Sequence, residues 1–178
     1  MRQSVAPARP DRIASMSHRL VLFSLCLLWL VAPVRAQAAD ALFQATLADL
    51  EGRPVALAQW RDRPLIVNFW ARWCAPCRKE IPELVRLREE YLGRGLEVLG
   101  IALEYQVEPV RDFARAYAMT YPVVLAQEHG HALMRALGNP KMGIPFTVAF
   151  DRRGKAVWVQ TGLMSRRDLE RAAAAALR

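Results

Sequence analysis

The alternation of apolar and polar positions predicts a chain of buried strands and amphipathic helices. Short apolar runs predict strands, and a run without polar breaks indicates a strand that helices cover on both faces. Such strands are expected at Leu65–Phe69, Leu96–Ala102, Tyr121–Leu125, Thr147–Phe150 and Ala156–Gln160. Apolar residues that recur every three or four positions predict helices at about 74–92, 108–119, 131–137 and 165–177.

The order of these elements predicts the fold class. Strand, helix, strand, helix and strand, followed by a hairpin and a last helix, indicate an α/β fold with a central mixed sheet and helices on both faces. Residues 41–60 add an N-terminal β-hairpin, because Phe43, Ala45 and Leu47 alternate with polar or small neighbours and Glu51–Pro54 is rich in turn-forming residues.

The N-terminal segment has the pattern of an export signal. Arg9, Arg12 and Arg19 precede an apolar run over residues 20–32, which suits a secretory signal and is short for a membrane span. Small residues that suit cleavage follow at 34–36 and 36–38, and the second site is preferred because both its small residues are alanine. We therefore expect a signal peptide at 1–38, a domain at 39–178, and a periplasmic or extracytoplasmic location.

Two alternatives to this assignment stay open. The apolar run could remain as an uncleaved membrane anchor, and contact with a membrane is expected only in that case. Met16 could be the true start, since Ser17, His18 and Arg19 directly follow it. Cys26 lies inside the apolar run and is expected to be removed with it.

The charge balance gives no indication of a nucleic-acid partner. The formal net charge is +8, of which residues 1–36 hold five arginines against Asp11, a net of +4. The rest has 20 basic and 16 acidic residues, again a net of +4, with the two signs interspersed. No clustered basic stretch indicates nucleic-acid binding, so no nucleic-acid partner is expected.

Cys74 and Cys77 are the cysteines that remain without the signal. One closely spaced pair constrains little of the unfolded chain, so it is expected to serve reactivity or metal binding rather than stability. The pair follows a buried strand and opens an amphipathic helix, where free N–H groups and the helix macrodipole favour a thiolate. This placement indicates redox chemistry through a reversible disulfide.

Two segments resemble the thioredoxin family. Phe69–Cys77 resembles the thioredoxin signature almost residue for residue, and Pro82 matches the proline that kinks the following helix. Gly143–Val148 resembles the segment whose proline is cis and faces the two cysteines. The export signal, the hairpin, the run Cys74–Glu80 and a helix-containing insertion over residues 102–137 resemble the TlpA/ResA branch of exported thiol–disulfide oxidoreductases. The resemblance covers nearly all of the expected domain and implies a thioredoxin fold.

The resemblance also implies roles for the residues around the cysteine pair. Cys74 is the expected nucleophile that attacks a substrate disulfide, and Cys77 resolves the mixed disulfide. Trp73 is expected to border the thiols and shield them. Ile144 and Pro145, with Pro145 in cis, are expected to bind the substrate, whose extended chain would pair with the neighbouring backbone.

Glu80 and Asn68 are the candidates for controlling protons. Glu80 lies three residues after Cys77 and so shares its side of the helix. The resemblance implies an acid that acts in proton transfer and substrate contact, while a solvated first-turn carboxylate stays open. Asn68 departs from ordinary thioredoxins, which have a buried aspartate there that assists the deeper cysteine. An amide cannot act as that base, which places more weight on Glu80 or on water.

Metal binding is the other possible use of the cysteines. His129 and His131 could complete a four-ligand site with Cys74 and Cys77. Copper-binding relatives of the fold have a wider cysteine spacing, and two nearby histidines in a polar loop are usually solvated. We therefore expect no metal, and no cofactor besides the redox-active disulfide.

The predicted function is that of an exported enzyme, a thiol–disulfide oxidoreductase of the protein-disulfide reductase type. An oxidising compartment would keep the cysteine pair oxidised, so reduction there implies a membrane-embedded electron donor. The resemblance implies disulfide-containing protein substrates such as apocytochrome c or the copper-site cysteines of an oxidase, and hence roles in cytochrome c biogenesis and cell redox homeostasis. The alternatives are a thiol oxidase or isomerase, or a copper metallochaperone of the same fold.

Overall fold

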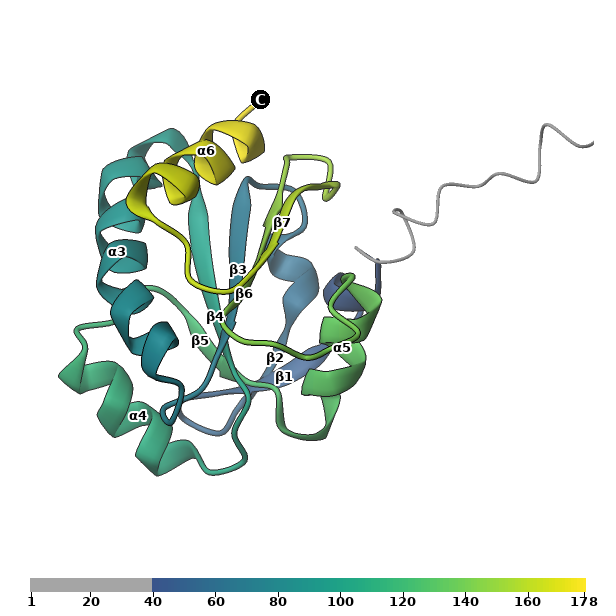
Figure 1. Cartoon of the computed structure of the whole chain (residues 1–178). Coiled ribbons are helices and arrows are strands. Elements are labelled where there is room, and N and C mark those ends of the chain that lie inside the picture. Colours follow the sequence, from purple (N-terminus) through teal and green to yellow (C-terminus); the bar gives the residue numbers. More distant parts are fainter. Residues whose placement is uncertain (1–39) are drawn as a thin grey trace, which may run out of the picture. The chain divides into compact units, whose positions relative to one another are not determined.

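A mixed sheet of seven strands runs through residues 40–178, the part of the chain that this computed structural model describes (Figure 1). The signal peptide expected at 1–38 lies outside that part. The strands are β1 (Thr46–Asp49), β2 (Pro54–Ala56), β3 (Leu65–Trp70), β4 (Glu97–Ala102), β5 (Val123–Leu125), β6 (Phe146–Phe150) and β7 (Ala156–Thr161). Their order is β2-β1-β5-β4-β3-β6-β7. β3, β4 and β5 are parallel, and the other pairings are antiparallel.

Helices cover both faces of the sheet, as expected from the order of elements. They are α3 (Ala75–Tyr91), α4 (Val107–Ala116), α5 (Gly130–Ala136) and α6 (Arg166–Ala176), with the short 3-10 helices η1 (Leu57–Trp60), η2 (Leu92–Arg94) and η3 (Gln127–His129). α3, α4 and α6 pack on one face, and α5 and η1 pack on the other (Figure 1). The expected α/β class is therefore confirmed.

Strand β3 divides the apolar core into two clusters. Ile66 and Trp70 face the cluster under α3 and α6, whereas Val67 and Phe69 face the cluster under α5. Successive side chains of a strand point to opposite faces, so a strand between two helical layers is apolar on both. Each fully buried side chain of this size contributes about 1.5–3 kcal/mol through removal of its surface from water.

The N-terminal hairpin is confirmed, but its first strand begins later than the sequence pattern predicts. β1 pairs with β2, and Leu47 lies opposite Val55. Residues 41–43 are helical instead of extended. Leu42 and Phe43 are consecutive and both buried, which a strand with one covered face does not allow. The Phe43 ring packs edge-on against Phe150, with the ring centroids 5.3 Å apart.

The expected helix after β4 also ends earlier than its apolar pattern predicts. α4 stops at Ala116, and Ala118 is exposed with a φ of 49° rather than packed inward. The left-handed backbone at Ala118 turns the chain toward β5 and so ends the helical repeat.

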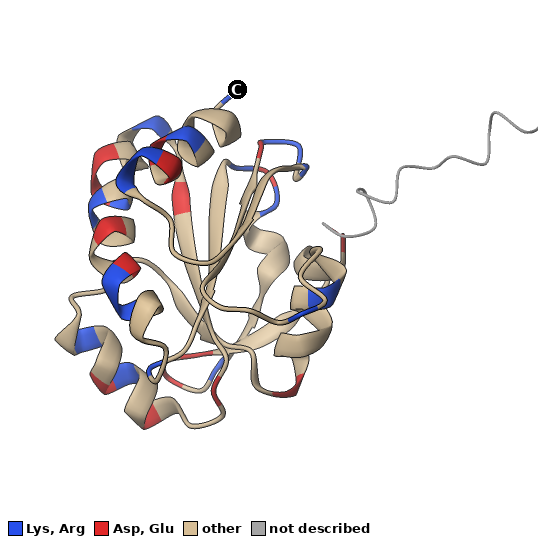
Figure 2. Cartoon of the chain, in the orientation of Figure 1, with Lys and Arg blue, Asp and Glu red and all other residues tan. Residues whose placement is uncertain are grey.

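Charged residues lie mainly on the outer surfaces of the helices. Cations and anions alternate along α3, α4 and α6 (Figure 2). An ion pair ties α3 to β4, because Arg88 Nε donates to Glu97 Oε1 at 2.6 Å and Nη2 to Oε2 at 3.2 Å. Within residues 40–178, no helix is long and apolar enough to cross a membrane.

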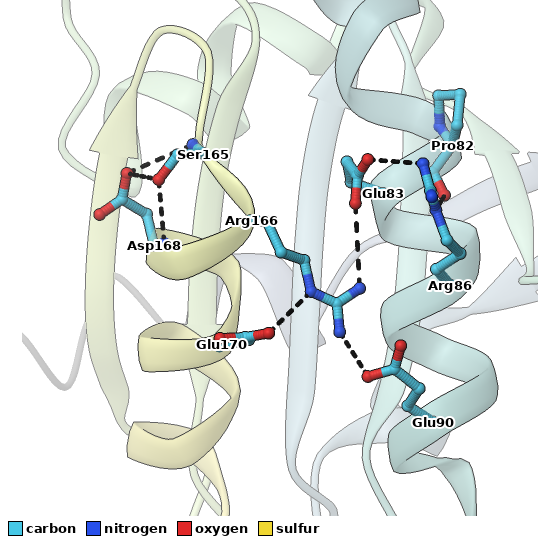
Figure 3. Close-up of polar contacts among 8 residues, drawn as sticks. All are labelled: Pro82, Glu83, Arg86, Glu90, Ser165, Arg166, Asp168 and Glu170. Carbon is cyan, nitrogen blue, oxygen red and sulfur yellow. Dashed lines mark hydrogen bonds and ion pairs between the residues drawn. The ribbon is translucent and has the colours of Figure 1, made fainter.

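The last helix begins with the capping box that the sequence predicts. The amide of Asp168 donates to Ser165 Oγ at 3.2 Å, and the Ser165 amide donates to Asp168 Oδ2 at 3.3 Å (Figure 3). The first residue of the helix, Arg166, pairs with Glu83 and Glu90 of α3 and with Glu170 of its own helix (Figure 3). The cap and the arginine together place the start of α6 against α3.

We predict that Ser165→Ala lowers the free energy of unfolding by about 1 kcal/mol, because the amide of Asp168 loses its side-chain acceptor. Urea denaturation followed by circular dichroism measures the change. Ser165→Asn is the matched control, since asparagine caps helices as well as serine does, and it should stay within a few tenths of a kcal/mol of wild type. An equal loss in both variants would exclude the capping hydrogen bond as the cause.

Candidate active site

Cys74 and Cys77 form a disulfide at the start of α3. Cys74 is the N-cap residue, and the Cys77 amide donates to Cys74 Sγ at 3.2 Å. Both cysteines are buried, Cys77 more deeply, with exposed fractions of 5% for Cys74 and 1% for Cys77. After reduction, the free N–H groups of the first turn would face the sulfur of Cys74 and favour its thiolate. Cys74 is therefore the less deeply buried of the two cysteines.

A cis proline lies at the same end of the sheet. The Ile144–Pro145 peptide bond is cis, as expected from the resemblance. Phe146 follows and pairs with Phe69 at the end of β3 from which the cysteine loop leaves. The carbonyl of Pro145 accepts the Gly162 amide at 2.7 Å, whereas Ile144 forms no backbone–backbone hydrogen bond with any described residue. The peptide groups of Ile144 can therefore pair with an incoming extended chain.

Glu80 is buried in the interior rather than solvated. The residue is 1% exposed and lies one helical turn after Cys77. Thr147 Oγ1 donates to Glu80 Oε1 at 3.3 Å, and the Met164 amide donates to Oε2 at 3.3 Å. The Asn68 amide group also donates to Oε1 at 3.3 Å. The open alternative of an exposed first-turn carboxylate is therefore excluded.

Burial controls the acidity of this carboxyl group. It raises the pKa of Glu80 from the ordinary 4.5 to about 7, because the ionised form loses its hydration. The hydrogen bonds from Met164 and Thr147 favour the ionised form and offset part of this rise. A group with a pKa near 7 can both accept and release a proton under neutral conditions.

Asn68 orients the carboxyl group without adding charge. Its Nδ2 lies 3.0 Å from Thr147 Oγ1 and 3.3 Å from Glu80 Oε1, and the residue is 1% exposed. The amide donates hydrogen bonds but does not take up protons near neutrality. Of these hydrogen-bonded side chains, Glu80 is therefore the one whose protonation can change near neutral pH.

An ion pair holds the loop that leads into the cysteines. Glu104, which follows β4, accepts the Arg72 amide at 2.7 Å and the Arg72 Nε at 2.6 Å. Glu104 is 9% exposed, so this pair is partly shielded from water. The two bonds hold the loop at the residue two positions before Cys74.

Trp73, which the resemblance led us to expect beside the thiols, directly precedes Cys74 and is 71% exposed. Its role in shielding the thiols stays a prediction. Tyr105 and Leu163 are 68% and 49% exposed and lie in loops that leave the same end of the sheet. We call Trp73, Tyr105 and Leu163 the apolar rim of the site.

The structure does not bring the two histidines to the cysteines. His129 and His131 are exposed at the start of α5, on the opposite face of the sheet from α3. Among residues 40–178, no group of three or more His, Cys, Asp or Glu side chains is arranged to hold a metal ion.

Four residues of the site were not predicted from the sequence. Thr147 had one usable signal, a hydroxyl inside an otherwise apolar strand. Arg72 and Glu104 are far apart in the chain, and Met164 contributes only its amide, so no sequence pattern marks them.

Comparison with known proteins identifies the class of this chain. Residues 37–177 match the Redoxin family. The chain is 32% identical over 124 residues to thiol-disulfide oxidoreductase ResA of Geobacillus thermodenitrificans, covering 70% of this chain and 69% of that one. It is 29% identical over 128 residues to thioredoxin-like protein YneN of Bacillus subtilis, covering 70% and 72%. The crystal structure of a thiol:disulfide interchange protein of Chlorobium tepidum superposes with a TM-score of 0.64 at 32% identity, covering 75% and 93%.

The fold and the disulfide, with these relatives, define a thiol–disulfide oxidoreductase with a thioredoxin fold. The chain belongs to the Redoxin family, and within it to the ResA-like oxidoreductases. The expected fold and enzyme class are therefore confirmed.

We predict that the raised pKa of Glu80 makes stability fall as the pH rises. Unfolded Glu80 loses its proton near pH 4.5, whereas the folded protein keeps it until about pH 7. The folded state binds more protons in this window, so the free energy of unfolding decreases across it. The loss is on the order of 3 kcal/mol, at about 1.4 kcal/mol per pKa unit.

Urea denaturation of the oxidised protein between about pH 4.5 and pH 8 tests this. Glu80→Gln should remove the decrease, and Glu89→Gln, at an exposed position of the same helix, should keep it. Parallel curves for wild type and Glu80→Gln would show that Glu80 is not the titrating group.

Proposed function

We propose that this protein is an exported reductase that transfers electrons from its cysteine pair to disulfides of other proteins. The observation that carries the proposal is a disulfide at a helix N-terminus with a cis proline and a buried carboxyl group beside it. We propose Cys74 as the nucleophile, Cys77 as the resolving cysteine and Glu80 as the proton acceptor.

The reaction balances within these groups. The Cys74 thiolate attacks one sulfur of the substrate disulfide, and the other substrate sulfur leaves as a thiolate, which takes up a proton. Glu80 accepts the proton of the Cys77 thiol, and the Cys77 sulfur then attacks Cys74 Sγ. The substrate leaves with two reduced sulfurs, and the enzyme ends as the disulfide that the structure contains.

The charges of the site support electron transfer from the cysteine pair to the substrate disulfide. An anionic carboxylate near a thiol raises the pKa of that thiol and so opposes the thiolate. A dithiol whose thiolate is strongly stabilised is an oxidant, as DsbA is. Glu80 therefore acts against the stabilisation that the N-terminus of α3 provides, and favours a lower potential.

The cysteine pair is the redox group in this proposal, and no further cofactor is invoked. Each reduced substrate leaves the enzyme oxidised, so a membrane-embedded donor has to return two electrons. The expected signal peptide would place the domain in the extracytoplasmic space where such a donor is needed. Apocytochrome c and the copper-site cysteines of an oxidase are the proposed substrates, on the resemblance to the ResA branch.

The surface around the disulfide suits an extended polypeptide. The apolar rim provides exposed side chains at the same end of the sheet, and the backbone of Ile144 adds pairing groups. Trp73, Ile144 and Pro145 are the proposed substrate-binding residues. A chain bound there would bury its own apolar side chains against the rim.

We predict that Cys77→Ala, produced in the native cell, traps substrates as mixed disulfides with Cys74. Without the resolving sulfur the intermediate persists, and mass spectrometry of the purified adducts identifies the partner. A variant lacking both cysteines is the control and should capture none.

Recovery of apocytochrome c or an oxidase subunit supports the proposal. A broad set of secreted proteins would indicate an oxidase or isomerase, and an absence of adducts would exclude disulfide exchange. The potential of the Cys74–Cys77 pair decides the direction: a value near the −120 mV that is typical of DsbA, within about 30 mV, would contradict a reductase.

We further predict that Leu163→Ser lowers kcat/KM for a disulfide-containing peptide about tenfold, a loss of about 1.4 kcal/mol of apolar contact. Reaction with a small disulfide that does not reach the rim should stay unchanged. Val159→Ser is the matched control, because Val159 is 51% exposed and lies on β7, outside the rim. Equal effects of the two substitutions would contradict a role of the rim.

A further inference from the structure

The sheet brings three loops together at the end opposite the cysteines. Leu65 at the start of β3 is paired with Glu97 at the start of β4 and with Phe150 at the end of β6. The loops before β3, before β4 and after β6 therefore lie side by side. This end is at the top of Figure 2, where the turn between β6 and β7 is blue. Cys74 follows the other end of β3, roughly 17 Å away at about 3.3 Å per residue.

These loops form a surface pocket of about 400 Å³. Its lining includes one arginine from each loop: Arg63 precedes β3, Arg94 precedes β4 and Arg152 follows β6. All three are exposed, and none forms an ion pair with another residue of the described range 40–178. We call the cavity with these three side chains the arginine pocket.

The acidic residues of the lining do not neutralise the arginine pocket. The lining contains two of them, Asp62 and Glu97. Glu97 is already paired with Arg88 of α3, whose Nε lies 2.6 Å from Glu97 Oε1. Asp62 is then the one remaining carboxylate against three guanidinium groups, which leaves a net of two positive charges.

Neighbouring contacts restrict two of the arginines. The Arg94 guanidinium lies over the Tyr91 ring, 5.0 Å from its centroid. A cation–π contact uses the face of the guanidinium, so its N–H groups remain available to an anion. Arg152 lies in a turn that Asp151 closes, since Asp151 Oδ1 accepts the Arg153 amide at 2.9 Å. The positions of both arginines are therefore set before any ligand arrives.

A phosphate group fits the chemistry of this pocket. Like charges repel each other, so three arginines around one cavity are stabilised by an anion. A guanidinium can donate two parallel hydrogen bonds to phosphate or carboxylate oxygens. A phosphate monoester carries a charge of about −1.5 to −2 at neutral pH, which matches the net charge of the pocket better than one carboxylate does. Leu92 also lines the pocket and is 44% exposed, so the carbon atoms of an organic phosphate can pack against it.

We propose that the arginine pocket binds a phosphate group, either free or in the headgroup of an anionic phospholipid. Arg63, Arg94 and Arg152 donate hydrogen bonds to the phosphate oxygens. This site goes beyond the proposed function, because it lies at the opposite end of the sheet from the cysteine pair. An occupied pocket therefore leaves the disulfide accessible to other proteins.

Titration of the ¹⁵N-labelled, oxidised full-length protein with inorganic phosphate tests the proposal. Sodium chloride keeps the ionic strength constant, so that general screening does not change during the titration. The Nε–H signals of the three arginines, assigned by single substitutions, should shift in NMR spectra and saturate with one dissociation constant. Arg94→Gln/Arg152→Gln should weaken binding about tenfold, because two charged donors are lost.

Arg115→Gln/Arg135→Gln is the matched control, since it removes the same charge from exposed positions of α4 and α5. It should bind phosphate as the wild type does. Shifts that do not saturate, or equal weakening in the two double variants, would overturn the proposal. Equal affinity for succinate, which carries two carboxylates, would overturn the assignment to phosphate.

Cosedimentation with lipid vesicles then distinguishes the two sources of the phosphate group. Anionic headgroups attract basic clusters, so vesicles of phosphatidylglycerol and phosphatidylcholine are compared with vesicles of phosphatidylcholine alone. Binding to the anionic vesicles that Arg94→Gln/Arg152→Gln loses and the control keeps would identify a lipid headgroup. Equal vesicle binding of the two double variants, with phosphate binding still dependent on the pocket, would identify a free phosphate. No disulfide substrate is used, so the result is independent of the proposed reductase activity.

Discussion

The buried carboxyl group of Glu80, one helical turn after the cysteine pair, is the constraint on which the rest of the structure depends. An ionisable side chain can stay in the interior only if other groups hydrogen-bond to it, because its charged form loses its hydration. Glu80 obtains these bonds from Asn68, Thr147 and the Met164 amide. β3 and β6 therefore have to be neighbours, and the loop before α6 has to close over the first turns of α3.

The cysteine pair lies between two opposing electrostatic effects. The N-terminus of α3 and the Cys77 amide favour a thiolate at Cys74, whereas an ionised Glu80 disfavours it. Asn68 is neutral, so Glu80 is the side chain in this group whose charge affects the stability of the thiolate. Because Glu80 titrates near pH 7, the balance changes with pH in the range where the enzyme would work.

Local sequence patterns were sufficient for the fold and for the reacting sulfurs, because both depend on near neighbours in the chain. Periodicity located the strands and helices, and the spacing of Cys74 and Cys77 placed them in one helical turn. The state of Glu80 could not be predicted in this way, since its partners Thr147 and Met164 lie 67 and 84 residues further along the chain.

The closing hydrogen bond from Met164 has a consequence for how the protein matures. A chain is synthesised from its N-terminus, so both cysteines are made long before the residues that enclose Glu80. Until residue 164 is in place, the carboxyl group remains open to solvent and keeps the acidity of an ordinary glutamate. A partly made chain therefore carries two thiols beside a glutamate of ordinary acidity, and the raised pKa of Glu80 appears only when the last loop closes.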